Sequence, residues 1–214
     1  LVERSEIRYA PSASVALHCM AAADAADVYR CFAGVAPEDE TIPQAVAEVE
    51  RAAQHFVQAR LFTGDQATRQ GLCRAARQGD VLHLATHGLF RPDHSFFSAL
   101  KLADGWVDVR ELYRLPVAAR LVVLSACESG AGEIRGGDEV IGLVRGFLVA
   151  GARRLVVSLW NVHDATAANL MDRFYARLTG DEAVGPATAL RMAQVEAIRE
   201  GTHPYFWAPY TVVG

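Results

Sequence analysis

Short apolar runs alternate along the chain with segments whose apolar positions recur at helical spacing. The short runs predict strands at 5–10, 28–37, 60–64, 81–86, 120–125, 153–160 and 205–214. The periodic segments predict helices at 12–23, 42–59, 67–78, 136–151, 164–178 and 185–200. Between 97 and 115 the pattern predicts a hairpin around Asp104 and Gly105, followed by one helical turn.

Strands that alternate with helices, and that consist of nearly continuous Val and Leu, are typical of a mostly parallel sheet covered by helices on both faces. The sequence therefore predicts the α/β class. It contains no internal repeat and no linker, so we expect residues 1–214 to form one domain. The chain starts at Leu1 without an initiating Met or a signal-peptide pattern, and we expect it to be cut from a longer protein.

Composition limits the possible partners. Of the 214 residues, 51% are hydrophobic and 21% charged, and no apolar run reaches the roughly 20 residues of a membrane span. A formal net charge of -4 argues against nucleic acid or an anionic membrane surface as the main partner. The four cysteines form no CxxC pair, so we expect no disulfide framework, no zinc site and a reducing, cytoplasmic location.

Two predicted strands end in a reactive side chain among small residues. "VLHLATHG" ends at His87 and Gly88, and "LVVLSACESG" contains Cys127 two residues after Ser125. In open α/β sheets, functional groups collect beyond the carboxyl ends of the strands. A cysteine thiolate is a nucleophile, and a nearby imidazole can take its proton or pair with it as a cation.

The same residues suggest how a substrate carbonyl would be held. Gly88 has no Cβ to keep a substrate from the backbone, and the N–H groups of Gly88 and Cys127 are candidates for an oxyanion hole. Each residue alone also has a plainer interpretation. A lone cysteine after an apolar strand is usually a small buried hydrophobe, and a lone histidine is usually only hydrogen-bonded.

Longer stretches carry a family resemblance. "HLATHG" and "LSACESG" resemble the His and Cys motifs of the CHAT domain, a branch of the caspase–separase group of cysteine peptidases. "FTGDQAT", "FSALKLADGWVDVRELYRLP", "RGGDEVIGLVRGFLVAGARRLVVSLWNVHDATAANLMDRFYARL" and "HPYFWAPYTVVG" are also similar to CHAT sequence, so the resemblance covers most of the chain. It implies a caspase-like three-layer α/β/α sandwich with a mostly parallel central sheet, peptide-bond hydrolysis, and a dyad of His87 and Cys127.

Complete CHAT domains begin with a further strand and often follow tetratricopeptide repeats, so we expect this chain to lack its first strand. We expect a bacterial, cytoplasmic cysteine endopeptidase without metal or other cofactor. Its expected partners are a protein substrate and a regulatory partner or upstream repeat region, without direct nucleic acid or membrane contact. The alternative is a non-catalytic caspase-like module for interaction or signalling. Because the chain keeps both His87 and Cys127, the enzyme is favoured.

A third stretch suggests a substrate pocket. "SLWNVHDAT" at 158–166 resembles the Leu-Trp-Asp-Val-Thr-Asp stretch of separases, whose final Asp contributes to a pocket for an arginine just before the cut. That Asp corresponds to Asp164, although Asn161 and His163 depart from the stretch. Asp138 is a weaker candidate for the same role, and Ser125 is expected to contact substrate. The alternative for Asp164 is to cap the helix that it begins.

The remaining reactive side chains have simpler expectations. The glycine-rich segment 129–142 lacks the Gly-Lys-Ser/Thr ending of a phosphate loop, and we expect it to line the cleft. His83 lies four residues before His87, on the same face of a strand, and is expected in the core or in a supporting role. Cys19, Cys31 and Cys73 are expected to be inert packing residues.

Overall fold

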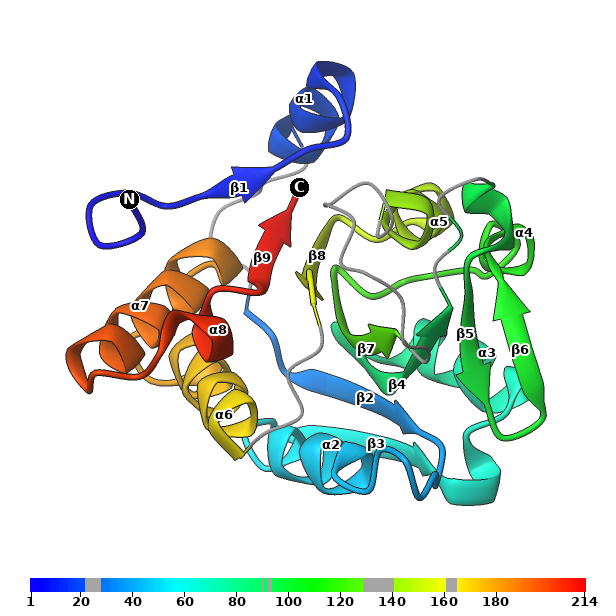
Figure 1. Ribbon diagram of the computed structural model, residues 1–214. Helices are drawn as coiled ribbons and strands as arrows, with labels where there is room; N and C mark the ends of the chain where they lie inside the picture. The colour runs from blue at the N-terminus through cyan, green and yellow to red at the C-terminus, as the bar shows by residue number, and fades with distance from the viewer. Residues whose placement is uncertain (22–27, 90, 92–93, 129–140, 161–164) are drawn as a thin grey trace.

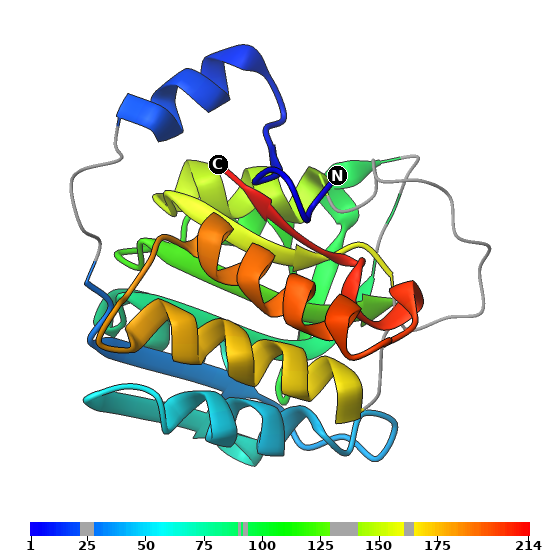
Figure 2. The same ribbon diagram turned by 90° about the vertical axis from the view of Figure 1, so that its left-hand side faces the viewer.

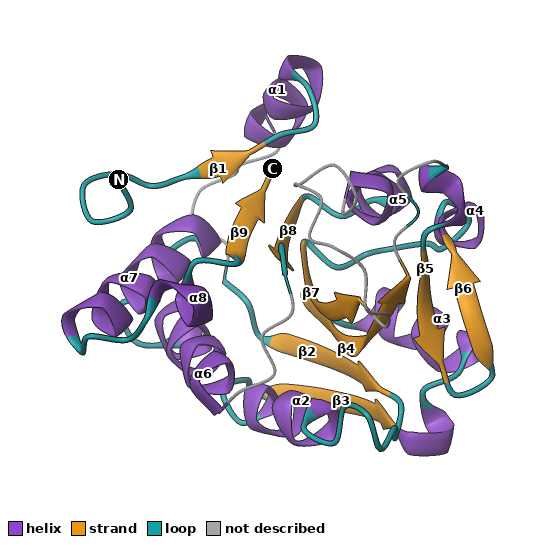
Figure 3. Cartoon of the chain, viewed as in Figure 1, coloured by secondary structure: helices purple, strands orange, loops and turns teal. Residues whose placement is uncertain are grey.

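A computed structural model of the chain describes residues 1–21, 28–89, 91, 94–128, 141–160 and 165–214. Its described strands form one sheet in the order β1-β9-β8-β7-β4-β2-β3, with β5 and β6 attached to β4 as a hairpin (Figure 1, Figure 3). The strands are β1 (Arg8–Tyr9), β2 (Cys31–Ala36), β3 (Gln58–Thr63), β4 (Val81–Leu89), β5 (Ala99–Leu102), β6 (Gly105–Asp108), β7 (Leu121–Glu128), β8 (Arg154–Ser158) and β9 (Tyr210–Val213).

Helices cover both faces of this sheet. Figure 2 shows α6 and α7 lying across one face, while Figure 1 shows α3, α4 and α5 grouped on the other side. The helices are α1 (Ala13–Ala21), α2 (Ala45–Ala53), α3 (Arg69–Gln78), α4 (Val109–Leu112), α5 (Ile141–Ala150), α6 (Ala165–Thr179), α7 (Pro186–Arg199) and α8 (Pro204–Trp207). Short 3₁₀ turns occur at Gly64–Gln66 and Ser95–Phe97.

The central strands are apolar throughout because both of their faces are buried. In β4, Leu82 and Leu84 belong to the core cluster that contains α3 and α5, whereas Val81 belongs to the cluster of α6 and α7. Side chains alternate between the faces of a strand, so two packed layers require apolar residues at successive positions. The predicted α/β architecture, with a mostly parallel sheet between helical layers, is confirmed.

Strand direction brings several strand ends to one edge. The neighbours β3-β2-β4-β7-β8 are parallel, so their carboxyl ends lie at the same edge of the sheet. β9 runs antiparallel to β8, and β5 and β6 form an antiparallel hairpin on the end of β4. The described loop that follows β2 contacts His87, the candidate base in β4, at this edge.

Several predicted elements were wrong in extent, and three of them show why. The helix expected over 42–59 ends at Ala53, because the backbone of Gln58–Thr63 pairs with β2 and this pairing overrides the helical spacing of the side chains. The strand expected over 205–214 begins only at Tyr210, since Pro204 starts a helical turn whose Tyr205 N–H is capped by His203. The strand expected over 5–10 is limited to Arg8–Tyr9, two residues paired with the edge of β9.

Asp80 joins the amino ends of three strands. Its Oδ2 accepts hydrogen bonds from the backbone N–H groups of Arg30 (2.9 Å) and Cys31 (3.0 Å), and its Oδ1 accepts one from the Arg120 guanidinium (3.2 Å). Burial acts to raise the pKa of Asp80, but these N–H groups and the positive charge of Arg120 outweigh it and hold the pKa below its ordinary value. The carboxylate is therefore bound more tightly than the neutral acid.

We expect Asp80→Asn to lower the free energy of unfolding by about 1–3 kcal/mol near pH 7, because the N–H groups of Arg30 and Cys31 and the Arg120 guanidinium lose a charged acceptor. The folded-state pKa lies below the unfolded one, so this contribution is full above about pH 4 and is lost as pH falls through the folded value. Urea unfolding of both proteins over a pH series measures it. The control is Asp181→Asn, at an exposed position. If the difference in unfolding free energy between wild type and Asp80→Asn stays constant into strong acid, the stabilising role of the Asp80 carboxylate is contradicted.

Candidate active site

His87 and Cys127 are partners in the parallel pairing of β4 with β7. Adjacent strands lie about 4.8 Å apart, and residues paired in this way project from the same face of the sheet. The backbone therefore brings the two positions together near the carboxyl edge of the sheet. The Cys127 side chain lies outside the described part of the structure, and a dyad of these residues stays a prediction.

The His87 ring is buried, with 7% of the residue exposed. Its Nε2 lies 2.7 Å from Thr41 Oγ1 and 3.7 Å from Asp39 Oδ2. Its other nitrogen, Nδ1, is the one buried side-chain nitrogen or oxygen without a hydrogen-bond partner among the described residues. An unpaired buried polar atom is costly and occurs most often where function requires it.

Asp39 and Thr41 come from the loop that follows β2. The Asp39 carboxylate accepts hydrogen bonds from Lys101 Nζ (2.7 Å), from the Thr41 hydroxyl (2.5 Å) and from the Thr41 N–H (2.9 Å). These hydrogen bonds, that of Lys101 first, hold the pKa of Asp39 well below its usual range. The side chain of Asp39 is only 13% exposed, so a nearly buried negative charge lies behind the His87 ring.

Sequence reasoning missed Asp39, Thr41 and Lys101. One signal was present, because Asp39 follows a predicted buried strand that ends at 37 and therefore lies at the same edge as His87. The contribution of Lys101 has no such signal. It depends on the β5–β6 hairpin turning back along β4, where Gly88 pairs with Leu100.

The other predicted site residues fall into two groups. Gly88 is buried in β4 and pairs with Glu128, and Ser125 is half-buried in β7 and pairs with Ala85. Their expected roles, in the oxyanion hole and in substrate contact, stay predictions. Asp138 and Asp164 lie outside the described residues.

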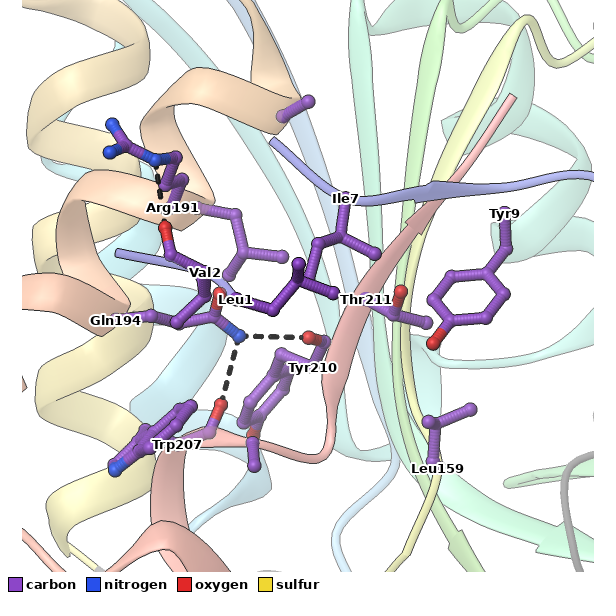
Figure 4. Close-up of a pocket in the computed structure, with 13 residues that line it drawn as sticks. Leu1, Val2, Ile7, Tyr9, Leu159, Arg191, Gln194, Trp207, Tyr210 and Thr211 are labelled. Atoms are coloured by element: carbon purple, nitrogen blue, oxygen red, sulfur yellow. Dashed lines mark hydrogen bonds between the residues drawn. The ribbon is translucent and has the colours of Figure 1, made fainter. Parts of the chain in front are cut away.

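Two hollows in the surface differ in their lining, and only the first is lined by a residue near His87. One, of about 400 Å³, is lined by Asp39 together with Pro37, Glu38, Glu40, Ile42 and Thr63. The other, of about 260 Å³, lies between the N-terminal segment, α7 and β9 (Figure 4). There Gln194 donates to the carbonyls of Trp207 and Tyr210, and none of the predicted site residues that the structure describes lines this second hollow.

His83 has a structural environment distinct from that of His87. It is fully buried, with Nε2 3.0 Å from Glu48 Oε1 and Nδ1 2.8 Å from the Tyr175 hydroxyl. Burial, and then the charge of Glu48, raises the pKa of Tyr175 well above its usual value, so the phenol keeps its proton and donates it to Nδ1. His83 thus links β4 to α2 and α6 within the core, in line with its expected role.

Among the described residues, no group of three or more His, Cys, Asp or Glu side chains is arranged to hold a metal ion. Cys19, Cys31 and Cys73 are free thiols. None of the helices in the described ranges is both long and apolar enough to cross a membrane.

Comparisons of the fold point to one class of protein. A chain of the Saccharomyces cerevisiae separase–securin complex, solved at 2.6 Å, matches with a TM-score of 0.67 and 11% identity, over 98% of this chain and 14% of that chain. A second structure of the complex, at 3.0 Å, matches with a TM-score of 0.59 and 13% identity, over 86% of this chain and 12% of that chain. The protein therefore has a separase-like, caspase-type α/β fold.

Sequence comparison identifies the family. The CHAT domain profile matches residues 1–214, so the chain belongs to the CHAT domain family. Tetratricopeptide repeat protein 28 of Mus musculus is 24% identical over 191 residues, which cover 72% of this chain and 8% of that protein. Its Homo sapiens counterpart is 35% identical over 107 residues, which cover 50% of this chain and 4% of that protein. The chain thus spans a small fraction of these relatives.

We expect Tyr175→Phe to lower the free energy of unfolding by about 1–3 kcal/mol, because it leaves His83 Nδ1 buried without a donor. Denaturant unfolding near neutral pH measures the change. Tyr113→Phe, which removes a hydroxyl from a half-buried ring on the other side of the sheet, is the matched control and should shift stability by less than about 0.5 kcal/mol. Equal effects of the two substitutions would show that the Tyr175 hydroxyl contributes nothing specific.

Proposed function

We propose that this chain is a cysteine-type endopeptidase domain in which His87 activates Cys127. The observation that supports this most is the pairing of the two residues across β4 and β7, near the carboxyl edge of the sheet. His87 Nδ1, which has no hydrogen-bond partner among the described residues, adds to it, since a general base needs an available lone pair. Membership of the CHAT family and the separase-like fold agree with the proposal.

The proposed reaction is acyl transfer in two stages. His87 Nδ1 takes the thiol proton, and the Cys127 thiolate attacks the scissile carbonyl to form a tetrahedral oxyanion. The N–H groups of Gly88 and Cys127 stabilise that oxyanion. His87 then gives the proton to the leaving amine, and the acyl-enzyme that remains is hydrolysed by a water molecule whose proton His87 accepts.

The partners in this proposal are a protein substrate and a regulator. The separase of the similar structures is seen in complex with securin, and the similar curated proteins are named for tetratricopeptide repeats. We propose that a partner or repeat region likewise controls this domain. We propose a cytoplasmic, reducing location, which suits a reactive thiol. The proposal of a bacterial origin rests on the family resemblance of the sequence alone.

The alternative is a non-catalytic interaction module of the same fold. It predicts an unreactive thiol at position 127, whereas the peptidase predicts a thiolate stabilised near neutral pH. The other cysteines provide an internal comparison. Burial raises the pKa of the Cys19 thiol, and the Cys31 thiol lies 3.6 Å from the Gln58 side-chain oxygen.

We expect iodoacetamide at neutral pH to label Cys127 at least about tenfold faster than Cys19, Cys31 or Cys73, because a nearby imidazole favours the thiolate. Peptide mass spectrometry over a time course measures each rate. His87→Ala should remove the difference, and Cys127→Ala and His87→Ala should each reduce proteolysis to background while the fold is kept.

Cys73→Ala serves as the control variant and should retain full activity, since Cys73 lies in α3. A chelator should leave proteolysis unchanged, because the proposed nucleophile is a thiolate. Equal labelling of all four cysteines would favour the interaction module. Activity that is lost in a chelator and restored by zinc would overturn the proposed chemistry.

Asp164 is proposed to contribute a carboxylate to the pocket for the residue just before the cut, with a preference for arginine. A carboxylate favours a guanidinium by charge and by paired hydrogen bonds. Fluorogenic peptides that differ only at this residue, Arg, Lys, Leu or Met, test it on wild type, Asp164→Ala and Asp138→Ala. We expect Asp164→Ala to lower kcat/KM for the Arg peptide by about 10- to 100-fold. The same substitution should change kcat/KM for the other peptides little. A Leu or Met preference in wild type would remove Asp164 from the site.

A further inference from the structure

Thr41 connects the nearly buried carboxylate of Asp39 to the His87 ring. Its Oγ1 lies 2.5 Å from Asp39 Oδ1 and 2.7 Å from His87 Nε2. A threonine hydroxyl has one proton to donate and lone pairs with which to accept. Since the Asp39 carboxylate can only accept, the Thr41 proton points to Asp39, and Thr41 Oγ1 accepts from His87.

This direction of hydrogen bonding fixes the tautomer of His87. If Nε2 donates to Thr41, the neutral ring carries its proton on Nε2 and leaves the lone pair on Nδ1. Nδ1 is the atom that has no hydrogen-bond partner among the described residues. The chain from Asp39 through Thr41 to Nε2 therefore leaves Nδ1 free to act as a base.

The negative charge of Asp39 also supports a role for His87 as a base. Asp39 Oδ2 lies 3.7 Å from Nε2, close enough for its negative charge to attract the positive charge of an imidazolium. Among the described residues, the charged groups on this side of the ring are Asp39 and, behind it, Lys101, whose Nζ lies 2.7 Å from Asp39 Oδ2. Cys127, which pairs with His87 in the register of β4 and β7, is the third titratable residue at this edge of the sheet.

We propose that Asp39 and Thr41 are positioning residues that hold His87 with Nδ1 free and stabilise its protonated form, which extends the dyad to Cys127–His87–Thr41–Asp39. This proposal rests on the proposed function of the site. In the activation step, the S–H bond of Cys127 breaks and an N–H bond forms at Nδ1. The proton on Nε2 stays on the ring, bound to Thr41, and Asp39 remains a carboxylate throughout.

The experiment separates the His87 environment from catalysis. The full chain with Cys127→Ala is labelled with ¹⁵N-histidine, and the tautomer of the neutral His87 ring is measured by NMR, with His87→Gln for assignment. Asp39→Asn should raise the fraction of rings that carry their proton on Nδ1, because the Thr41 hydroxyl is then no longer held as an acceptor by a carboxylate. Thr41→Val, which keeps the shape of Thr41 without its hydroxyl, should also raise this fraction, and Thr41→Ser should keep it at the wild-type level.

Cys127 reactivity gives the second measurement, in chains that keep the cysteine. We expect Asp39→Asn and Thr41→Val each to slow alkylation of Cys127 by iodoacetamide near pH 6 by about tenfold, because the thiolate–imidazolium pair forms less readily. Thr41→Ser should stay within about threefold of wild type. Asp65→Asn, a change of the same type at an exposed position after β3, should alter neither measurement.

The possible results distinguish this proposal from the proposed function. If His87→Ala and Cys127→Ala abolish proteolysis while the His87 tautomer is the same in Asp39→Asn, the peptidase stands and the positioning role is overturned. If the tautomer changes but Cys127 is no more reactive than Cys73, the peptidase fails and the role in activating Cys127 fails with it. A wild-type ring protonated on Nδ1 would contradict the proposed direction of hydrogen bonding.

Discussion

The parallel register of β4 against β7 is the constraint on which the candidate site depends. Side chains alternate along a strand, so a slip of one residue would move Cys127 to the face of the sheet opposite His87. Eight successive pairs, from Val81 with Leu121 to Gly88 with Glu128, fix the register. Both faces of these strands are packed, and a slip would therefore expose or misplace every buried side chain along them. The requirements of folding and of the proposed chemistry coincide here.

The two histidines of β4, His83 and His87, differ in hydrogen bonding according to their position along the strand. His83, four residues below the edge, has both ring nitrogens paired, with Glu48 and with Tyr175. His87, at the edge, has one nitrogen paired and one free among the described residues. A fully satisfied buried imidazole stabilises the fold, whereas a half-satisfied one keeps a lone pair for reaction at some cost in stability. Thr41, from the loop after β2, contacts His87, whereas His83 is paired with side chains of α2 and α6.

The layered α/β fold and the positions of His87 and Cys127 could be predicted because both depend on local pattern. Runs of Val and Leu that end in small residues identify buried strands and their carboxyl ends. The bounds of individual helices and strands were harder to predict. Residues 58–63 pair with β2, although the apolar spacing over 42–59 is helical. Asp39 and Thr41 could not be predicted as a site, because their roles depend on the path of a loop that no short-range pattern encodes.

The contact between Lys101 and Asp39 suggests why the carboxylate is supported from two sides. An unpaired carboxylate with 13% of its side chain exposed would pay a desolvation cost and tend to take up a proton. Lys101 and Thr41 together keep Asp39 ionised, so the negative charge behind His87 does not depend on whether the ring itself is charged. Because β5 carries Lys101 and pairs directly with β4 at Gly88, the hairpin fixes this charge relative to His87. The electrostatics of the ring are therefore set by the strand pairing that also presents it at the sheet edge.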